Sequence, residues 1–225
     1  MSTSRSQHPV ASPTARSPRW GWPQLVVLGC TLAYLIPFGA ICLQGGNREF
    51  LLYLTVMLGL MPLVAWLHAR IGLHVGTLWG LSAWGLAHLA GGLLRIPTHW
   101  PHDDTPVLYD LWLIPGWLRY DQLVHAFGFG ISTWICWQGL RAAFRDAGVV
   151  IRPGPGLLAL CSLAGMGLGA LNELVEFLAV LTLPDTNVGG YENTGWDLVF
   201  NAFGATIAAV LIAATSGSEQ RLEDR

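Results

Sequence analysis

Two glutamates, Glu173 and Glu176, lie in the segment 168–181, which is otherwise almost wholly apolar (LGALNELVEFLAVL). A further apolar segment carries Asp197. A charged side chain at the centre of a membrane-spanning helix costs about 2.5–3.5 kcal/mol on insertion scales. Three such carboxylates would cost about 8–10 kcal/mol, which is comparable to the whole stability of a domain. Protonation, water, an arginine such as Arg95 or Arg119, or a bound cation must therefore offset this cost.

The spacing of these residues predicts a metal site. Asp121 and His125 are four residues apart, and Glu173 and Glu176 are three apart, so each pair lies on one face of a helix. One imidazole with several carboxylates suits Zn, Mn or Fe(II) better than Ca or an ion selected by thiolates. Helical bundles build metal sites from such residues. We therefore predict that Asp121, His125, Glu173, Glu176 and Asp197 are metal ligands.

A metal at this position would activate water for hydrolysis, and Glu173 or Glu176 would then serve as the general base. His88 and Asn201 are secondary members of the predicted site. The competing interpretation is structural, because buried polar side chains in membrane bundles also hydrogen-bond between helices. For His88 alone, an interior histidine with satisfied hydrogen bonds is the more common case.

The composition indicates an integral membrane protein of one domain. Of 225 residues, 52% are hydrophobic and only 12% charged, against roughly 25% charged in soluble domains, and the mean hydropathy is +0.47. Backbone polar groups in lipid must be satisfied within helices or a closed barrel, and these apolar runs are too long for barrel strands. The predicted fold is an all-α, polytopic membrane helix bundle. Its six candidate spans are 23–43, 50–68, 73–94, 120–140, 156–183 and 195–215.

The arginines predict the orientation of this bundle, because cytoplasmic loops are enriched in positive charge. Nine arginines fall on the side of the two termini: Arg5, Arg16, Arg19, Arg70, Arg141, Arg145, Arg152, Arg221 and Arg225. Three fall on the other side: Arg48, Arg95 and Arg119. Both termini are therefore predicted to be cytoplasmic. A disordered basic arm (1–21) precedes the transmembrane domain (22–215), and a polar tail (216–225) follows it.

With this orientation, the polar side chains of four spans reach a similar depth toward the outer side. Three of these spans turn from polar to small residues toward the cytoplasm, as in the face of Gly165, Gly169 and Glu173. We predict an outward-facing polar cavity above a tightly packed floor. A lipid headgroup, a lipid-linked sugar or a cell-wall precursor would suit such a position as substrate.

The connecting segments carry weaker signals. Segment 95–117 is predicted to be a solvated interfacial loop, with a lid or a second metal site as the alternative. Segment 184–195 has the composition of a turn, and 141–156 that of a cytoplasmic turn. The four cysteines form no CxxC pair and are predicted to be buried apolar side chains. No phosphate-cradling loop, nucleophile elbow or nucleic-acid motif is present, and no nucleic-acid partner is predicted. Membrane lipid is the predicted partner, with a second copy of the chain as a further candidate.

Three motifs, YDQLVHAFGFG (120–130), NELVEF (172–177) and WDLVFNAFGA (196–205), together resemble the YjdF-like inner-membrane proteins of bacteria and, more distantly, VanZ-like proteins. The resemblance implies a location in the bacterial inner membrane and a functional polar cluster, without implying a reaction. The chain departs from the YjdF-like pattern at Asn201, where that pattern has an aspartate, and at Gly195, where it has an acidic residue.

Three functions remain open from the sequence. The first is a metal-dependent membrane enzyme acting at the outer leaflet. The second is a proton- or ion-coupled transporter, since intramembrane carboxylates carry protons, with a homodimer supplying the half that six spans lack. The third is a non-catalytic membrane module that binds a lipid or a partner.

Overall fold

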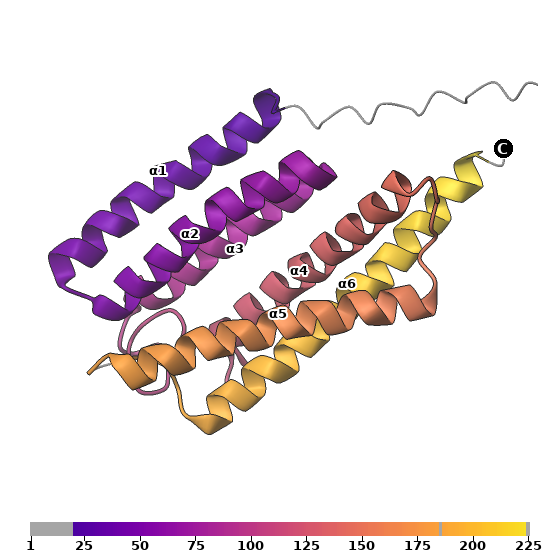
Figure 1. Cartoon of the computed structure of the whole chain (residues 1–225). Coiled ribbons are helices and arrows are strands. Elements are labelled where there is room, and N and C mark those ends of the chain that lie inside the picture. Colours follow the sequence, from indigo (N-terminus) through magenta and orange to yellow (C-terminus); the bar gives the residue numbers. More distant parts are fainter. Residues whose placement is uncertain (1–19, 185, 224–225) are drawn as a thin grey trace, which may run out of the picture.

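The computed structural model describes residues 20–184 and 186–223, and within them the chain forms a bundle of six long helices (Figure 1). Successive helices run in alternating directions, so α1 begins and α6 ends at the same end of the bundle. The helices are α1 (Trp22–Gly45), α2 (Arg48–Ile71), α3 (Val75–Leu93), α4 (Tyr120–Asp146), α5 (Pro155–Thr182) and α6 (Tyr191–Glu223).

Four helices are long and apolar enough to cross a membrane: α1, α2, α5 and the part of α6 from Tyr191 to Ser216. The chain is thus a membrane protein with several apolar helices, whereas six transmembrane spans are not confirmed. The helices α3 and α4 are not among these four, and both carry buried polar side chains. Among these are Ser82 in α3 and Gln122, His125 and Gln138 in α4.

The outer surface of the bundle is apolar, whereas polar side chains lie in its interior. On α5, Leu174, Phe177 and Leu181 are more than half exposed, whereas Glu173 is buried. A soluble protein rarely exposes a continuous apolar face of this kind, because contact with water is unfavourable. The exposed face of α5 is therefore suited to lipid, and its polar face is directed at the other helices.

Glycines let α4, α5 and α6 approach closely at the middle of the bundle. A Cβ added to Gly204 would collide with the backbone of Ala126 in α4, and one added to Gly165 would collide with the Thr133 side chain. Such small-residue contacts replace the hydrophobic driving force that is missing between helices in lipid. They form a packed layer next to the polar residues.

Substitution of Gly204 with leucine is expected to destabilise the bundle by at least about 1–3 kcal/mol, because the obstacle is backbone rather than a movable side chain. Thermal unfolding in detergent measures the effect. Gly167→Leu is the matched control, since Gly167 is exposed on α5 and a Cβ there meets no atom within 4 Å. Equal melting temperatures for the two variants would contradict the close α4–α6 approach.

The connection between α3 and α4 is folded rather than extended. It contains a short antiparallel hairpin, β1 (Trp112–Ile114) and β2 (Leu118–Arg119), with Gly116 at positive φ in the turn. Backbone bonds from Tyr109 to Gly91 (2.8 Å) and from Leu108 to Leu94 (3.0 Å) tie the connection to the end of α3. This loop therefore covers one end of the bundle and can form a wall there.

The ends of α6 differ from the predicted boundaries. The helix begins at Tyr191, within the segment predicted as a turn, and continues to Glu223, beyond the predicted end of the span at 215. Of the predicted N-terminal arm, only Trp20 and Gly21 belong to the described residues.

Candidate functional site

The imidazole of His125 on α4 lies among carboxylates from three helices. Its Nε2 is 3.6 Å from Asp121 Oδ1 and 3.9 Å from Asp197 Oδ1, and its Nδ1 is 3.6 Å from Glu173 Oε1. These distances exceed those of ordinary hydrogen bonds. The structure thus brings α4, α5 and α6 together around one histidine, with space between the polar atoms.

The five predicted ligands form two overlapping groups that share His125. Asp121, His125 and Asp197 are one group, and His125, Glu173 and Glu176 are the other. In each group, one ligand atom per residue lies within 4.8 Å of the others. Ligands bound to one ion at about 2.0–2.2 Å lie no more than about 4.4 Å apart, so the spacing in each group is close to what one ion requires.

Several polar atoms of this cluster are buried without a hydrogen-bond partner among the described residues. They include both carboxylate oxygens of Glu173, Oδ1 of Asp197 and Nδ2 of Asn201. Glu173 is 8% exposed, Asp197 0% and Asn201 1%. Leaving a buried polar atom unsatisfied costs about 1–3 kcal/mol, and more for a charged group. Orphaned carboxylate oxygens that face an imidazole nitrogen fit a cation better than a purely structural hydrogen-bond network.

Two asparagines form hydrogen bonds with members of the first group. The Oδ1 of Asn201 lies 3.1 Å from Nδ1 of His125, and the amide of Asn193 donates to Oδ2 of Asp197 at 2.6 Å. A carbonyl oxygen only accepts, so this contact fits the imidazole tautomer that donates from Nδ1, and in that tautomer Nε2 carries the lone pair that can bind a cation. That lone pair faces Asp121 and Asp197. The arrangement matches metal-binding histidines, whose second nitrogen donates to a fixed acceptor.

The second group has a different environment. Glu176 accepts a hydrogen bond from Asn172 Nδ2 at 2.9 Å and is half-buried, whereas Glu173 lies deeper, beside the protonated Nδ1 of His125. Because Nδ1 is occupied by its proton, this group lacks a nitrogen ligand. Glu173 and Glu176 therefore lie beside the group of Asp121, His125 and Asp197 and are less suited to be the principal ligands of an ion there.

A polar cavity of about 960 Å³ lies above the cluster. Its walls are formed by the loop between α3 and α4, the start of α2 and the segment that leads into α6. Asp121 and Glu176 of the cluster also line it. Its lining contains polar residues that the sequence analysis did not assign to a site: Glu49, Tyr53, Tyr109 and Asn193. The asparagine could have been found as an i,i+4 neighbour of Asp197, whereas Glu49, Tyr53 and Tyr109 carry no local signal.

Comparison with known families identifies the family of the chain. A family model described as a predicted membrane protein family (DUF2238) matches residues 24–217, which include nearly all of the bundle. The chain belongs to this family. The match fits the predicted YjdF-like resemblance, while the more distant VanZ-like resemblance is not shown. No curated protein and no solved structure matches the chain.

In this DUF2238 protein, His88 lies apart from the cluster around His125. Its ring packs edge-on against Tyr53 and Tyr109, with centroids 5.4 and 5.6 Å away. The hydroxyl of Tyr109 is hydrogen-bonded to Nδ1 of His88, and burial raises the pKa of this phenol well above its ordinary value, so it stays protonated. His88 is thus hydrogen-bonded to protein and forms part of the cavity wall.

Arg119 does not neutralise the buried carboxylates of the DUF2238 protein directly. Its Nη1 pairs with Asp103 at 3.2 Å, and its Nη2 donates to Oδ1 of Asn193. Since Asn193 in turn donates to Asp197, the arginine orients the asparagine that supports the cluster. Asp197 therefore has a polarised amide beside it, without an ion pair to this arginine.

Proposed function

We propose that this DUF2238 protein binds a divalent metal ion at Asp121, His125 and Asp197 and hydrolyses a lipid or other envelope substrate whose polar part enters the cavity. The observation that carries the proposal is the imidazole of His125. Its Nδ1 is fixed by Asn201, and its Nε2 faces two carboxylates, one of which has an orphaned buried oxygen.

The donor set favours Zn, Mn or Fe(II), because it combines one imidazole nitrogen with carboxylate oxygens. A metal at this place would activate water for hydrolysis. Glu173 and Glu176 lie on the adjacent face of α5, where either can accept the proton of that water as the general base. Glu176 also reaches the cavity, so it is the carboxylate nearer to an entering substrate.

We further propose that all six helices span the bacterial inner membrane, with both termini in the cytoplasm. The alternating directions of the helices support this arrangement, because α1 begins and α6 ends at the same end (Figure 1). The excess of arginines at that end agrees with the positive-inside rule. The cavity then opens at the outer leaflet, where lipid headgroups and envelope precursors are within reach.

Elemental analysis of the protein purified in detergent tests the proposal. We expect near-stoichiometric Zn, Mn or Fe in the wild type. Asn201→Ala should weaken metal binding about 10–100-fold, because the Nδ1 proton loses its acceptor. Asn201→Asp keeps an acceptor for that proton and should retain the metal. A wild type without metal after purification and after addition of each ion, or equal affinity in both variants, would reject the site.

A further inference from the structure

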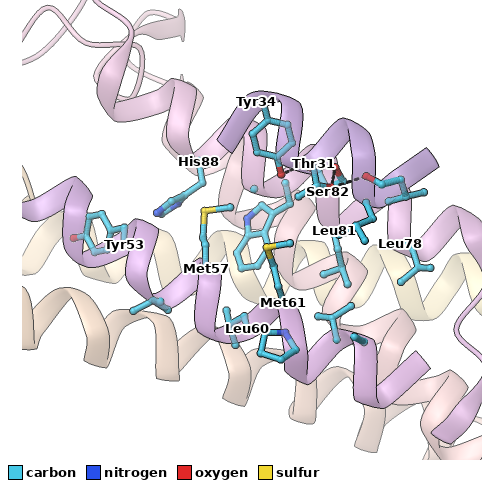
Figure 2. A pocket seen from close by; sticks show the side chains of 18 of the residues that line it. Thr31, Tyr34, Tyr53, Met57, Leu60, Met61, Leu78, Leu81, Ser82 and His88 are labelled. Carbon is cyan, nitrogen blue, oxygen red and sulfur yellow. Dashed lines mark hydrogen bonds between the residues drawn. The ribbon is translucent and has the colours of Figure 1, made fainter. Parts of the chain in front are cut away.

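A second, apolar pocket of about 400 Å³ lies between α1, α2 and α3. Its lining is dominated by aliphatic and thioether side chains, which Figure 2 shows along the pocket. Examples are Met57, Leu60 and Met61 of α2 and Leu78 and Leu81 of α3. Unbranched methionine side chains adapt to ligands of variable shape. The volume is within the range of about 300–1,000 Å³ that ligand sites occupy.

Three hydroxyl side chains of this pocket already have partners within the protein. The hydroxyls of Thr31 and Ser82 lie 2.7 Å apart, Thr31 also donates to the carbonyl of Val27, and the Tyr34 hydroxyl donates to the carbonyl of Ser82 at 2.9 Å. No donor among these is left for a polar ligand. The pocket is therefore suited to a hydrocarbon chain.

The apolar pocket meets the polar cavity at Tyr53 and His88, which line both. In Figure 2 these two residues lie at one end of the apolar pocket, and Leu78 lies toward the other. An occupant that extends from one space to the other must be apolar along one part and polar at its end. A membrane amphiphile has this shape, with its chain among α1, α2 and α3 and its head above Asp121 and Glu176.

The charge of the polar cavity selects the head group. Seven acidic side chains line it, namely Glu49, Asp103, Asp104, Asp110, Asp121, Glu176 and Glu192. The arginine of the lining, Arg119, already pairs with Asp103. An anionic head would be repelled by every one of these side chains that is ionised, whereas an amine can donate to a carboxyl group in either protonation state.

We infer that the two spaces form one binding site for a lipid with an amine-bearing head group, whose hydrocarbon chain occupies the pocket between α1, α2 and α3. The inference rests on the proposed function in one respect, because it names the class of substrate presented to the cluster around His125. The apolar pocket itself is independent of any metal.

Photo-crosslinking tests the inference. Phosphatidylethanolamine with a diazirine in one acyl chain is added to the protein in dodecylmaltoside, irradiated, and the labelled peptides are identified by mass spectrometry. Labels are expected on the segments around Met57 and Leu81. Met57→Trp and Leu81→Trp each fill the pocket and should lower labelling of the other segment about tenfold. Leu58→Trp is the control, because Leu58 is half exposed on the outer face of α2 and does not line the pocket.

The head group is tested with phosphatidylglycerol that carries the same chain, which should label the pocket at least about tenfold less. Equal labelling of the two lipids, or equal labelling of Met57→Trp, Leu81→Trp and Leu58→Trp, would overturn the inference. Thermal melting and metal content are measured on the same samples to separate misfolding from loss of binding. Pocket-dependent labelling of a metal-free protein would support the lipid site while rejecting the metal site.

Discussion

Replacement of His125 with alanine is expected to reduce bound metal to less than about a tenth of the wild-type amount. The imidazole is the nitrogen ligand of the proposed site, and its loss leaves two carboxylates that cannot hold a transition metal through purification. A tenfold loss of metal affinity corresponds to about 1.4 kcal/mol of binding free energy. The loss of the imidazole ligand is expected to cost more than this. Elemental analysis of detergent-purified protein measures the loss.

Two matched variants make this result specific. His99→Ala removes an exposed histidine from the loop between α3 and α4 and should leave the metal content unchanged. Glu173→Gln should also retain the metal, because Glu173 lies beside the protonated Nδ1 rather than beside the free lone pair of His125. Metal that remains in His125→Ala at the wild-type level would place the ion elsewhere in the protein.

The same variants separate binding from catalysis. If Glu173 is the general base, Glu173→Gln should lower the release of water-soluble head groups from an envelope lipid extract by about 10²–10⁴-fold at full metal content. His125→Ala should abolish both metal and release. A variant that loses the metal and keeps full release would remove the metal from the proposed chemistry.

The local part of the site could be predicted from the sequence, because it depends on helical periodicity. Asp121 and His125 share a face of α4, and Glu173 and Glu176 share a face of α5, as their spacings of four and three residues require. The similar depth of these pairs follows from alternating spans. These regularities are properties of single helices in a bilayer, and they need no knowledge of which helices touch.

The remaining part of the site depends on tertiary contacts that no local pattern encodes. The carbonyl of Asn201 reaches His125 across 76 residues, and this contact selects Nε2 as the free nitrogen. In the same way, Glu49 accepts a hydrogen bond from the backbone of Asn187, 138 residues away, and so closes a wall of the cavity. A lone glutamate at the start of α2 is indistinguishable in the sequence from an ordinary first-turn acid.

The number of membrane-spanning helices is difficult to derive from hydropathy alone. Hydropathy averages each helix over all its faces, and it therefore underrates α3 and α4, whose polar residues are turned toward protein. Gln138, for example, donates to Thr77 at 2.6 Å and accepts from the backbone of His74. Such side chains lower the hydropathy of a helix without exposing polarity to lipid. The burial of these side chains must therefore be considered together with composition when α3 and α4 are assessed as spans.

Removal of metal is expected to reverse the stability order of the wild type and Asp197→Asn. In the metal-free wild type, Asp197 is fully buried with Oδ1 unpartnered, and leaving a buried polar atom unsatisfied is unfavourable. The substituted amide still accepts from Asn193, and its NH₂ group can donate to Nε2 of His125. Asp197→Asn should therefore gain about 1 kcal/mol over the metal-free wild type, or roughly 2–4 °C in Tm.

Metal at about one hundred times its Kd should stabilise the wild type by about 2.7 kcal/mol, or roughly 5–11 °C in Tm, whereas Asp197→Asn should gain little. The wild type is thus the less stable protein in chelator and the more stable one in metal. Asp146→Asn is the control, because Asp146 is an exposed carboxylate at the opposite end of α4 and should not alter either order. If Asp197→Asn melts below the wild type in both conditions, Asp197 is stabilised by protein contacts alone, and the cluster needs no cation to fold.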